Sequence, residues 1–443
     1  MKLVYGVKDK PKFGQLIVFA LQQLLAILAA TIAVPAIIGN GMSHSAALFG
    51  AGLGTIVYLL FTKFKSPVFL GSSFAFIGSM FAAFASAASA AAGYAGLILG
   101  AAFAALVYVI IAIVVKFAGV KWINKLMPPV VIGPTVALIG LSLAGAAIND
   151  LKAGKVLVDG VSVASPYACI ICGLVTLAGV IIASVYGKKM TKLIPFIIGI
   201  VAGYVVATVL TLIGTATSNP ALMIIDFSAF SNMQWYPDFT FVTALKGVKE
   251  IDASYIATIA VAYVPVAFVV FAEHIADHKN LSSIIGTELL EEPGLHRTLL
   301  GDGVGSFVGA IFGGCPNTTY GESVGCVAIT GNASVITIVT TAIIAIIASF
   351  VAPFVTFLAT IPNCVMGGVC ISLYGFIAVS GLKMIQSVDL GQNKNLFVVA
   401  VILITGIGGL TLTFGQITIT SIACALILGI LTNLLVSKAK NED

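Results

Sequence analysis

The chain has 443 residues, of which 59% are hydrophobic and only 9% are charged. Soluble globular domains carry about 25% charged residues, so this composition excludes a soluble protein. The net charge of +5 is spread over short polar segments, which excludes a basic face for nucleic acid. We therefore expect a protein that crosses a membrane many times and has lipid, not nucleic acid, around it.

Apolar stretches long enough to cross a bilayer recur along the whole chain. About 20 apolar residues span the hydrocarbon core as a helix, and a helix satisfies its own backbone hydrogen bonds there. The pattern predicts an all-α polytopic membrane protein with fourteen spans. In chain order these are residues 14–37, 44–62, 68–87, 92–118, 127–148, 167–187, 193–215, 254–278, 298–314, 318–331, 333–358, 363–382, 395–413 and 416–437.

Basic residues are distributed unevenly over the segments between these spans. If the N-terminus is cytoplasmic, 18 of the 22 Lys and Arg residues lie in inner segments. The outer segments then hold only Lys152, Lys155, Lys246 and Lys249. Because Lys and Arg favour the cytoplasmic side, we expect a multi-pass protein of a bacterial-type cytoplasmic membrane with both termini inside.

Fourteen spans can arise from two repeats of seven, and an odd repeat length inverts the second copy. The letters VFA at residues 18–20 recur at 270–272, but such short matches leave the repeat open. The third and tenth spans say more, because residues 68–74 and 316–322 are β-prone and polar before they turn helical. Unwound backbone is tolerated at membrane depth where it lines a cavity, so these two broken segments predict a transport site.

Four of the 17 acidic residues lie within predicted spans: Glu273, Asp277, Asp302 and Glu322. Ionisable groups at membrane depth are costly and are functional by default. Glu273 and Asp277 stand four residues apart, which places both carboxylates on one helical face. Such a pair can share a proton and act as a proton relay. Alternatively, Asp277 only marks the end of its span in solvent.

One histidine pair and one cysteine pair could in principle bind a metal. His274 and His278 share a helical face, and Cys169 and Cys172 form a CxxC motif. The histidine pair has no matching third ligand nearby, and the CxxC motif has no second cysteine pair and no polar surroundings, so we expect no metal and no other cofactor. His274 is expected to be a structural hydrogen-bonding residue.

The tenth span offers a binding site for a polar ligand at its break. Glu322 follows the Tyr320-Gly321 turn, where a starting helix favours a carboxylate and presents free N–H groups. Phe74 stands at the equivalent break of the third span and could cover a flat ligand, although it could also simply pack in the interior. Together these groups suit a small planar molecule with adjacent N–H and C=O groups.

Four motifs carry a resemblance to a known family. They are PNTTYGESVG at residues 316–325 with TG at 330–331, FAEHI at 271–275, GLHR at 294–297, and GSSFAFI at 71–77. In order and spacing they resemble the nucleobase–ascorbate transporter family over essentially the full chain, and are most similar to its bacterial members that carry uracil. The resemblance implies two inverted seven-span repeats. It also implies a core domain (residues 1–120 and 254–360) and a gate domain (residues 121–253 and 361–443).

The same resemblance implies a function and a set of site residues. The expected function is proton-coupled symport of uracil by an elevator-type movement of core against gate, in a homodimer. Glu273 and Glu322 would bind the pyrimidine, and Phe74 and Gly321 would offer backbone amides to it. The remaining implied residues are Tyr320, Tyr374 and Ser73 around the substrate, and Asp277 and Asp302, with Glu273, for proton coupling.

Three residues depart from the pattern of the uracil-carrying members. Asp277 stands where several of them have His, Ser323 replaces an Asn, and Gln23 replaces a His of the first span. Glu322 favours uracil, but a purine symporter for xanthine or urate on the same scaffold is the alternative. A passive channel is a second alternative, although it needs no carboxylate pair. A membrane enzyme would need a nucleophile with its base, which we do not find in the sequence.

Overall fold

The computed structural model describes residues 3–119, 128–158, 161–188, 190–414 and 417–437. Helices dominate it, and they are α1 (Phe13–Ile38), α2 (His44–Phe61), α3 (Ile77–Ala85), α4 (Ala90–Ala118), α6 (Pro129–Ser142), α7 (Ala144–Asp150), α8 (Pro166–Val185), α9 (Met190–Leu193), α10 (Pro195–Ala216), α11 (Thr240–Gly247), α12 (Ala253–Ile285), α13 (Leu295–Gly313), α14 (Gly321–Thr330), α15 (Val335–Ala348), α16 (Ala352–Thr360), α17 (Asn363–Ile385), α18 (Asn393–Ile407) and α19 (Ser421–Val436). The strands are β1 (Leu70–Ser72), β2 (Leu157–Val158), β3 (Val161–Ser162), β4 (Asn317–Thr319), β5 (Leu412–Phe414) and β6 (Ile417–Ile419).

The predicted spans coincide with one helix, with two consecutive helices, or with a helix that a short strand precedes or follows. Among the described residues, eight helical segments are long and apolar enough to cross a membrane: α1, α2, α4, α6 with α7, α8, α10, α12 and α17. Helices α15 and α16, bent by 83° at their junction, would make a ninth. The number fourteen stays a prediction, and the starts of the fifth and fourteenth spans at residues 127 and 416 lie outside the described residues.

The two broken segments pair with each other. Strand β1 runs antiparallel to β4, with Leu70 opposite Thr319 and Ser72 opposite Asn317. A short helical turn (η1, Phe74–Phe76) and α3 follow β1, and α14 follows β4. This confirms the prediction of strand and helix segments in the third and tenth spans. Because the strands are antiparallel, the helices that follow them lead away in opposite directions.

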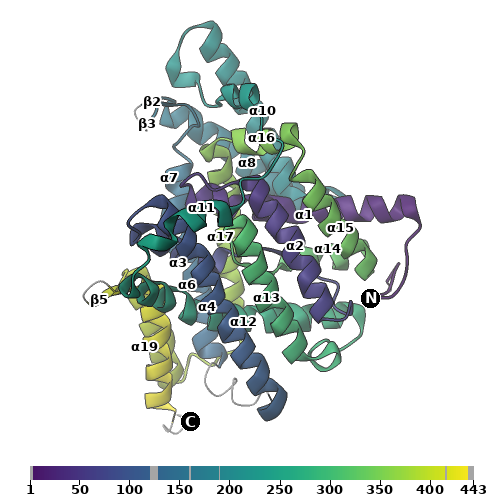
Figure 1. The fold of residues 1–443 in the computed structure, drawn as a ribbon, viewed down its shortest axis with the longest axis vertical. Coiled ribbons are helices and arrows are strands. Elements are labelled where there is room, and N and C mark those ends of the chain that lie inside the picture. Colours follow the sequence, from purple (N-terminus) through teal and green to yellow (C-terminus); the bar gives the residue numbers. More distant parts are fainter. Residues whose placement is uncertain (1–2, 120–127, 159–160, 189, 415–416, 438–443) are drawn as a thin grey trace.

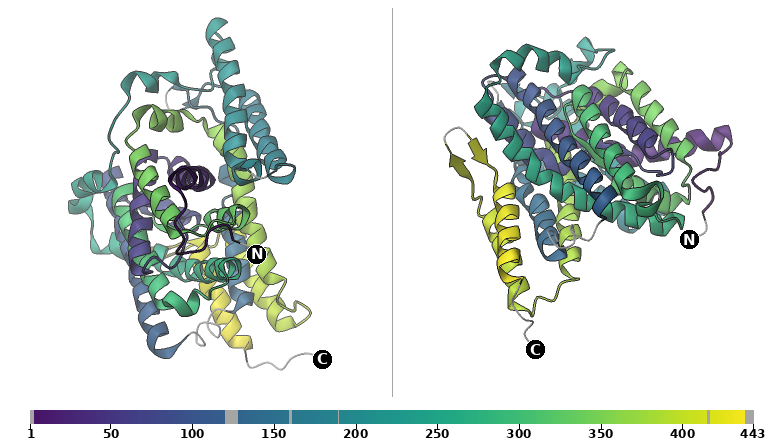
Figure 2. Two further views of the ribbon diagram at one scale, coloured as in Figure 1. Left: turned by 90° about the vertical axis from the view of Figure 1, so that its right-hand side faces the viewer. Right: turned by 60° about the horizontal axis from the view of Figure 1, so that its bottom comes forward.

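The helices pack in two groups (Figures 1 and 2). In the first group, α2 and α4 flank α13, α12 lies against α4, and α15 lies against α1 and α2. In the second group, α17 packs on α6 and α8, α10 packs on α8, and α18 packs on α19 and α6. Figure 2 shows α19 and the β5–β6 hairpin at one edge of the molecule.

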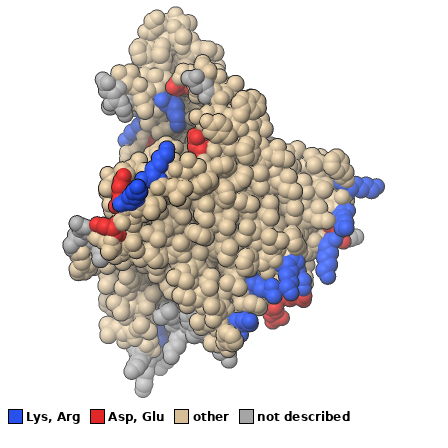
Figure 3. Space-filling view, viewed as in Figure 1, with Lys and Arg blue, Asp and Glu red and all other residues tan. Residues whose placement is uncertain are grey.

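The surface is largely uncharged (Figure 3), with Lys, Arg, Asp and Glu gathered toward its margins on the face shown. Large apolar side chains such as Phe117 and Tyr167 are about four-fifths exposed, at 80% and 79%. An apolar surface of this extent fits contact with lipid. The chain is therefore a multi-pass membrane protein.

Two elements differ from the sequence-based boundaries. Helix α12 continues to Ile285 instead of ending at residue 278, and Gly286 then ends it in a left-handed conformation. Polar residues after position 278 hid this extension, because they continue the helix beyond the apolar window. The β5–β6 hairpin occupies the junction of the last two predicted spans, where alternating β-branched residues favour strands.

Candidate functional site

A cavity of about 410 Å³ lies between the two helix groups, and we call it the large cavity. Its polar wall comes from the first group, from the breaks after β1 and β4 and from α12. Its apolar wall comes from the second group and includes Val136, Ile139, Phe196, Leu373, Phe376 and Ile377. This volume is in the range of small-molecule sites, which combine apolar walls with a few polar groups.

Most of the predicted site residues line this cavity: Ser73, Phe74, Glu273, Asp277, Tyr320, Gly321 and Glu322. Two others lie behind its wall. Tyr374 is buried, with its ring centroid 6.1 Å from that of Phe74 in an edge-on arrangement. Asp302 is completely buried, and its Oδ2 lies 2.7 Å from Nδ1 of His274. The roles of all nine stay predictions.

The two carboxylates of α12 face the cavity together, as their spacing of one helical turn requires. Glu273 is exposed to the cavity, whereas Asp277 is half-buried. The Thr319 hydroxyl at the end of β4 donates a hydrogen bond of 3.0 Å to Oδ2 of Asp277. Strand β4 and helix α12 are therefore tied together at the polar wall.

Both broken segments present helix starts at the cavity. Helix α14 begins at Gly321 and carries Glu322 in its first turn, and no side chain caps that turn. The η1 turn begins at Phe74 and also lacks a side-chain cap. The first N–H groups of a helix have no partner within it, so these starts can donate hydrogen bonds to a ligand and favour negative charge.

Tyr320 packs against a glycine in the paired strand and is held by a hydrogen bond of its hydroxyl. The Tyr320 hydroxyl donates to the carbonyl of Ser72 at 2.8 Å, across the β1–β4 pair. A Cβ added to Gly71 would lie 2.3 Å from the Tyr320 ring. Only glycine leaves room for this ring, which explains a glycine inside a strand. That strand glycine is the sequence signal by which the contact could have been found.

Gln23 and Ser323, two of the three residues that depart from the pattern of the uracil-carrying members, contact each other. Nε2 of Gln23, on α1, donates a hydrogen bond to Oγ of Ser323. The same oxygen accepts the N–H of Phe69 at 2.9 Å. Both side chains are buried, so they attach α1 to α14 behind Glu322 and do not line the cavity. Residues 300 positions apart carry no local signal of such a contact.

The histidines of α12 point away from the cavity. Nδ1 of His274 contacts Asp302 and its Nε2 contacts Thr298 at 2.9 Å, both on α13. In the described part of the chain, no group of three or more His, Cys, Asp or Glu side chains is arranged to hold a metal ion.

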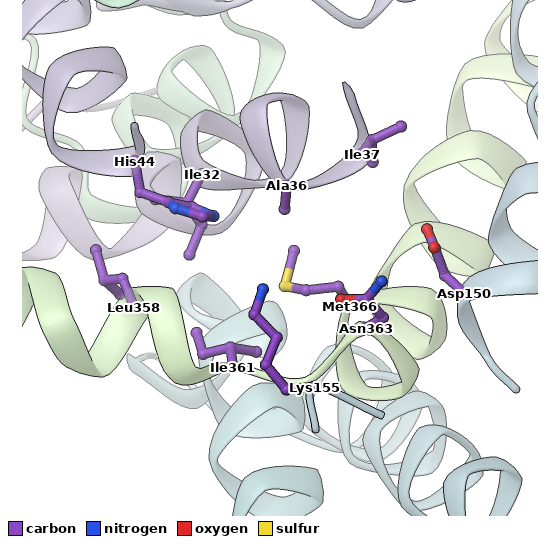
Figure 4. Close-up of a pocket in the computed structure, with 10 residues that line it drawn as sticks. All are labelled: Ile32, Ala36, Ile37, His44, Asp150, Lys155, Leu358, Ile361, Asn363 and Met366. Atoms are coloured by element: carbon purple, nitrogen blue, oxygen red, sulfur yellow. The ribbon is translucent and has the colours of Figure 1, made fainter. Parts of the chain in front are cut away.

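A second, small cavity lies at the other end of α17 (Figure 4), lined by Asn363 and Met366 of that helix. Its charged groups are Lys155 and Asp150, with His44 opposite. Burial lowers the pKa of Lys155 from its ordinary value. The negative charges of Asp150 and Asp226 raise this pKa, but their effect is smaller than that of burial. The volume is about 10 Å³, which holds one water molecule and no organic ligand.

Known structures share this fold. The transmembrane domain of the cyanobacterial bicarbonate transporter BicA matches 98% of this chain over 100% of its own, with a TM-score of 0.60 and 15% identity. The structure of SLC26A9 matches 96% of this chain over 66% of its own, with a TM-score of 0.66 and 13% identity. The chain thus has the helical fold of membrane transporters.

Sequence relatives identify the family within that class. The model of the permease family matches residues 14–415, so the chain belongs to this family, the nucleobase–ascorbate transporters. It is 40% identical to the uracil permease of Bacillus caldolyticus, over 98% of this chain and 95% of the relative. It is 36% identical to the uracil permease of Bacillus subtilis (strain 168), over 100% and 97%. For the Escherichia coli (strain K12) uracil permease the identity is 33%, over 96% and 92%.

Proposed function

We propose that this protein is a secondary active transporter that carries uracil into the cell together with protons. One observation carries the proposal: the large cavity joins Glu273 and Glu322 with two uncapped helix starts and an aromatic ring. The relatives at 33–40% identity are uracil permeases, which supports the substrate.

The groups of the cavity complement uracil, which has two N–H donors and two C=O acceptors in one plane. The carboxylates of Glu273 and Glu322 accept the N–H groups. The backbone N–H groups at Phe74 and Gly321 donate to the carbonyl oxygens. The Phe74 ring packs on one face of the base, and the apolar wall from α6 and α17 covers the other.

Uracil is neutral at pH 7, so its accumulation needs another driving force. Asp277 lies one turn from Glu273, within the same cavity, and protonation of this pair removes the repulsion between its members. We assign proton binding to Asp277 and Glu273. Asp302 would act behind them through its contact with His274.

The arrangement of helices supports an elevator-type movement between two inverted seven-span repeats. The first helix group belongs to the proposed core (residues 1–120 and 254–360), and the second to the proposed gate (residues 121–253 and 361–443). The antiparallel β1–β4 pair and its oppositely directed helices suit an inverted repeat. We place both termini in the cytoplasm and expect a homodimer in the membrane.

The test is uptake of labelled uracil into proteoliposomes, with and without an inward proton gradient. Gradient-driven uptake that Glu322→Gln abolishes supports the proposal. The Glu292→Gln variant is the matched control, because Glu292 pairs with Lys65 at the surface. Uptake that ignores the gradient contradicts symport and favours a passive channel.

Xanthine or urate is the second candidate substrate, because about 410 Å³ also has room for a bicyclic purine. Unlabelled xanthine added to the same uptake assay separates the two. Strong competition by xanthine would identify a purine as the substrate and would leave the proposed fold and proton coupling unchanged.

A further inference from the structure

Helix α2 lies behind the site and contacts the elements that form its polar wall. Within the described residues, α2 contributes no side chain to the lining of the large cavity. It nevertheless packs along α13 (Figure 1). Several of its turns carry buried polar groups. Three of these turns contact the three elements that form the polar wall of the cavity: β4, β1 and α12.

The first contact holds β4. The Asn317 side chain donates through Nδ2 to the carbonyl of Gly50 at 3.0 Å. A Cβ on Gly54, one turn along α2, would lie 2.8 Å from that same nitrogen, and a Cβ on Gly309 of α13 would lie 2.0 Å from it. Asn317 is therefore fixed between two helices whose glycines leave room for it alone. Thr318 to Glu322, which line the cavity, follow it directly.

The second contact holds β1. The N–H of Leu70 donates to Oγ1 of Thr55 at 2.9 Å. Both residues are completely buried, where an unpaired polar group is costly. Ser73 and Phe74, which line the cavity, stand three and four residues beyond Leu70.

The third contact holds α12. The Tyr58 hydroxyl lies 2.7 Å from Nε2 of His278 and 2.7 Å from Oγ of Ser66. Nδ1–H of His278 donates to the carbonyl of His274 at 2.8 Å, so the imidazole has hydrogen-bond partners on both of its nitrogens. His278 directly follows Asp277, so its contact with Tyr58 attaches α12 to α2 beside the two carboxylates that line the cavity.

We propose that α2 is the positioning helix of the nucleobase site and that Tyr58 and His278 are positioning residues for the carboxylates of α12. This inference rests on the proposed function. One rigid helix sets the distances between the acids of α12 and the helix starts after β1 and β4. Hydrogen-bonding geometry tolerates only small errors in such distances. The Tyr58–His278 contact can be removed by deleting a single hydroxyl, so it is the one tested here.

The test compares Tyr58→Phe with Tyr255→Phe in the full-length protein reconstituted in lipid. Tyr255 is the matched control, because its buried hydroxyl donates to the carbonyl of Ala83 at 2.7 Å, away from the large cavity. We expect Tyr58→Phe to raise the Kd for labelled uracil about fivefold per folded molecule. The control should keep the wild-type Kd.

Two variants of His278 test whether a hydrogen bond to Tyr58 is enough to preserve uracil binding. A glutamine amide can reach the Tyr58 hydroxyl, so His278→Gln should bind uracil within about twofold of wild type, whereas His278→Ala should weaken binding at least as much as Tyr58→Phe. Equal, wild-type affinity of folded Tyr58→Phe and His278→Ala would overturn the proposal. So would equal losses in His278→Gln and His278→Ala.

Hydrogen–deuterium exchange separates this inference from the proposed function. Tyr58→Phe should speed exchange in peptides covering residues 66–72 and 273–285, and Tyr255→Phe should not. If the wild-type protein binds no nucleobase but these peptides respond, the positioning role stands and the proposed function fails. Unchanged exchange in both peptides overturns the positioning role whatever the ligand.

Discussion

The large and the small cavity lie at opposite ends of α17, and both contain ionisable side chains. Leu373, Phe376, Ile377, Ser380 and Met384 line the large cavity, whereas Asn363 and Met366 line the small one. The large cavity has about 410 Å³ and the small one about 10 Å³. Only the large cavity is bordered by the broken β1 and β4 segments. Ionisable side chains beside a cavity therefore do not by themselves identify a ligand site, and sufficient volume with unpaired backbone groups must accompany them.

Glu273→Gln is expected to cause the greatest loss of uracil affinity, about a hundredfold, because a charge-assisted hydrogen bond to the base is replaced by a neutral one. Equilibrium binding of labelled uracil to purified protein measures the effect. If this variant binds uracil as tightly as the wild type, Glu273 does not contact the base, and the proposed site loses its main polar contact.

Gly71→Ala should weaken uracil binding about tenfold, because the added methyl overlaps the Tyr320 ring and overpacking costs about 1–3 kcal/mol. Gly78→Ala is the matched control, since its Cβ would meet Ile422 at an ordinary 3.6 Å. Thermal unfolding and uracil binding are measured for both. Equal behaviour of the two variants would show that Tyr320 does not need its present position.

Asp277→Asn should change uracil affinity only about threefold, because the Thr319 hydroxyl can still donate to the amide oxygen at this position. Uptake into proteoliposomes should, however, lose its response to an inward proton gradient. Full gradient dependence in this variant would move proton coupling away from Asp277.

Lys155→Met should leave the Kd for uracil unchanged, because the small cavity holds no organic ligand. Burial lowers the pKa of Lys155, so the folded protein resists the charged form, and removing the ammonium should raise Tm slightly. This gain should be largest below the lowered pKa and should shrink as pH rises toward the ordinary lysine value. Lys152→Met, at an exposed neighbour, is the control. A large loss of uracil binding in Lys155→Met would make the small cavity part of the binding site.

Local pattern in the sequence was enough for much of this protein. Apolar windows located the helices, and the four-residue spacing placed Glu273 and Asp277 on one face of α12. The polar, β-prone runs at residues 68–74 and 316–322 located the two breaks. These features depend on the period of a helix and on the cost of unpaired backbone in lipid, and both can be read within a few neighbouring residues.

Tertiary structure alone decided which distant residues meet. The register of β1 with β4, the Gln23–Ser323 contact and the attachment of His278 to Tyr58 join segments far apart in the chain. It also decided that Asp302 contacts His274 and that Tyr374 lies behind Phe74. Such contacts follow from how whole helices pack against each other, and no single helix records in its own sequence which neighbour it will have.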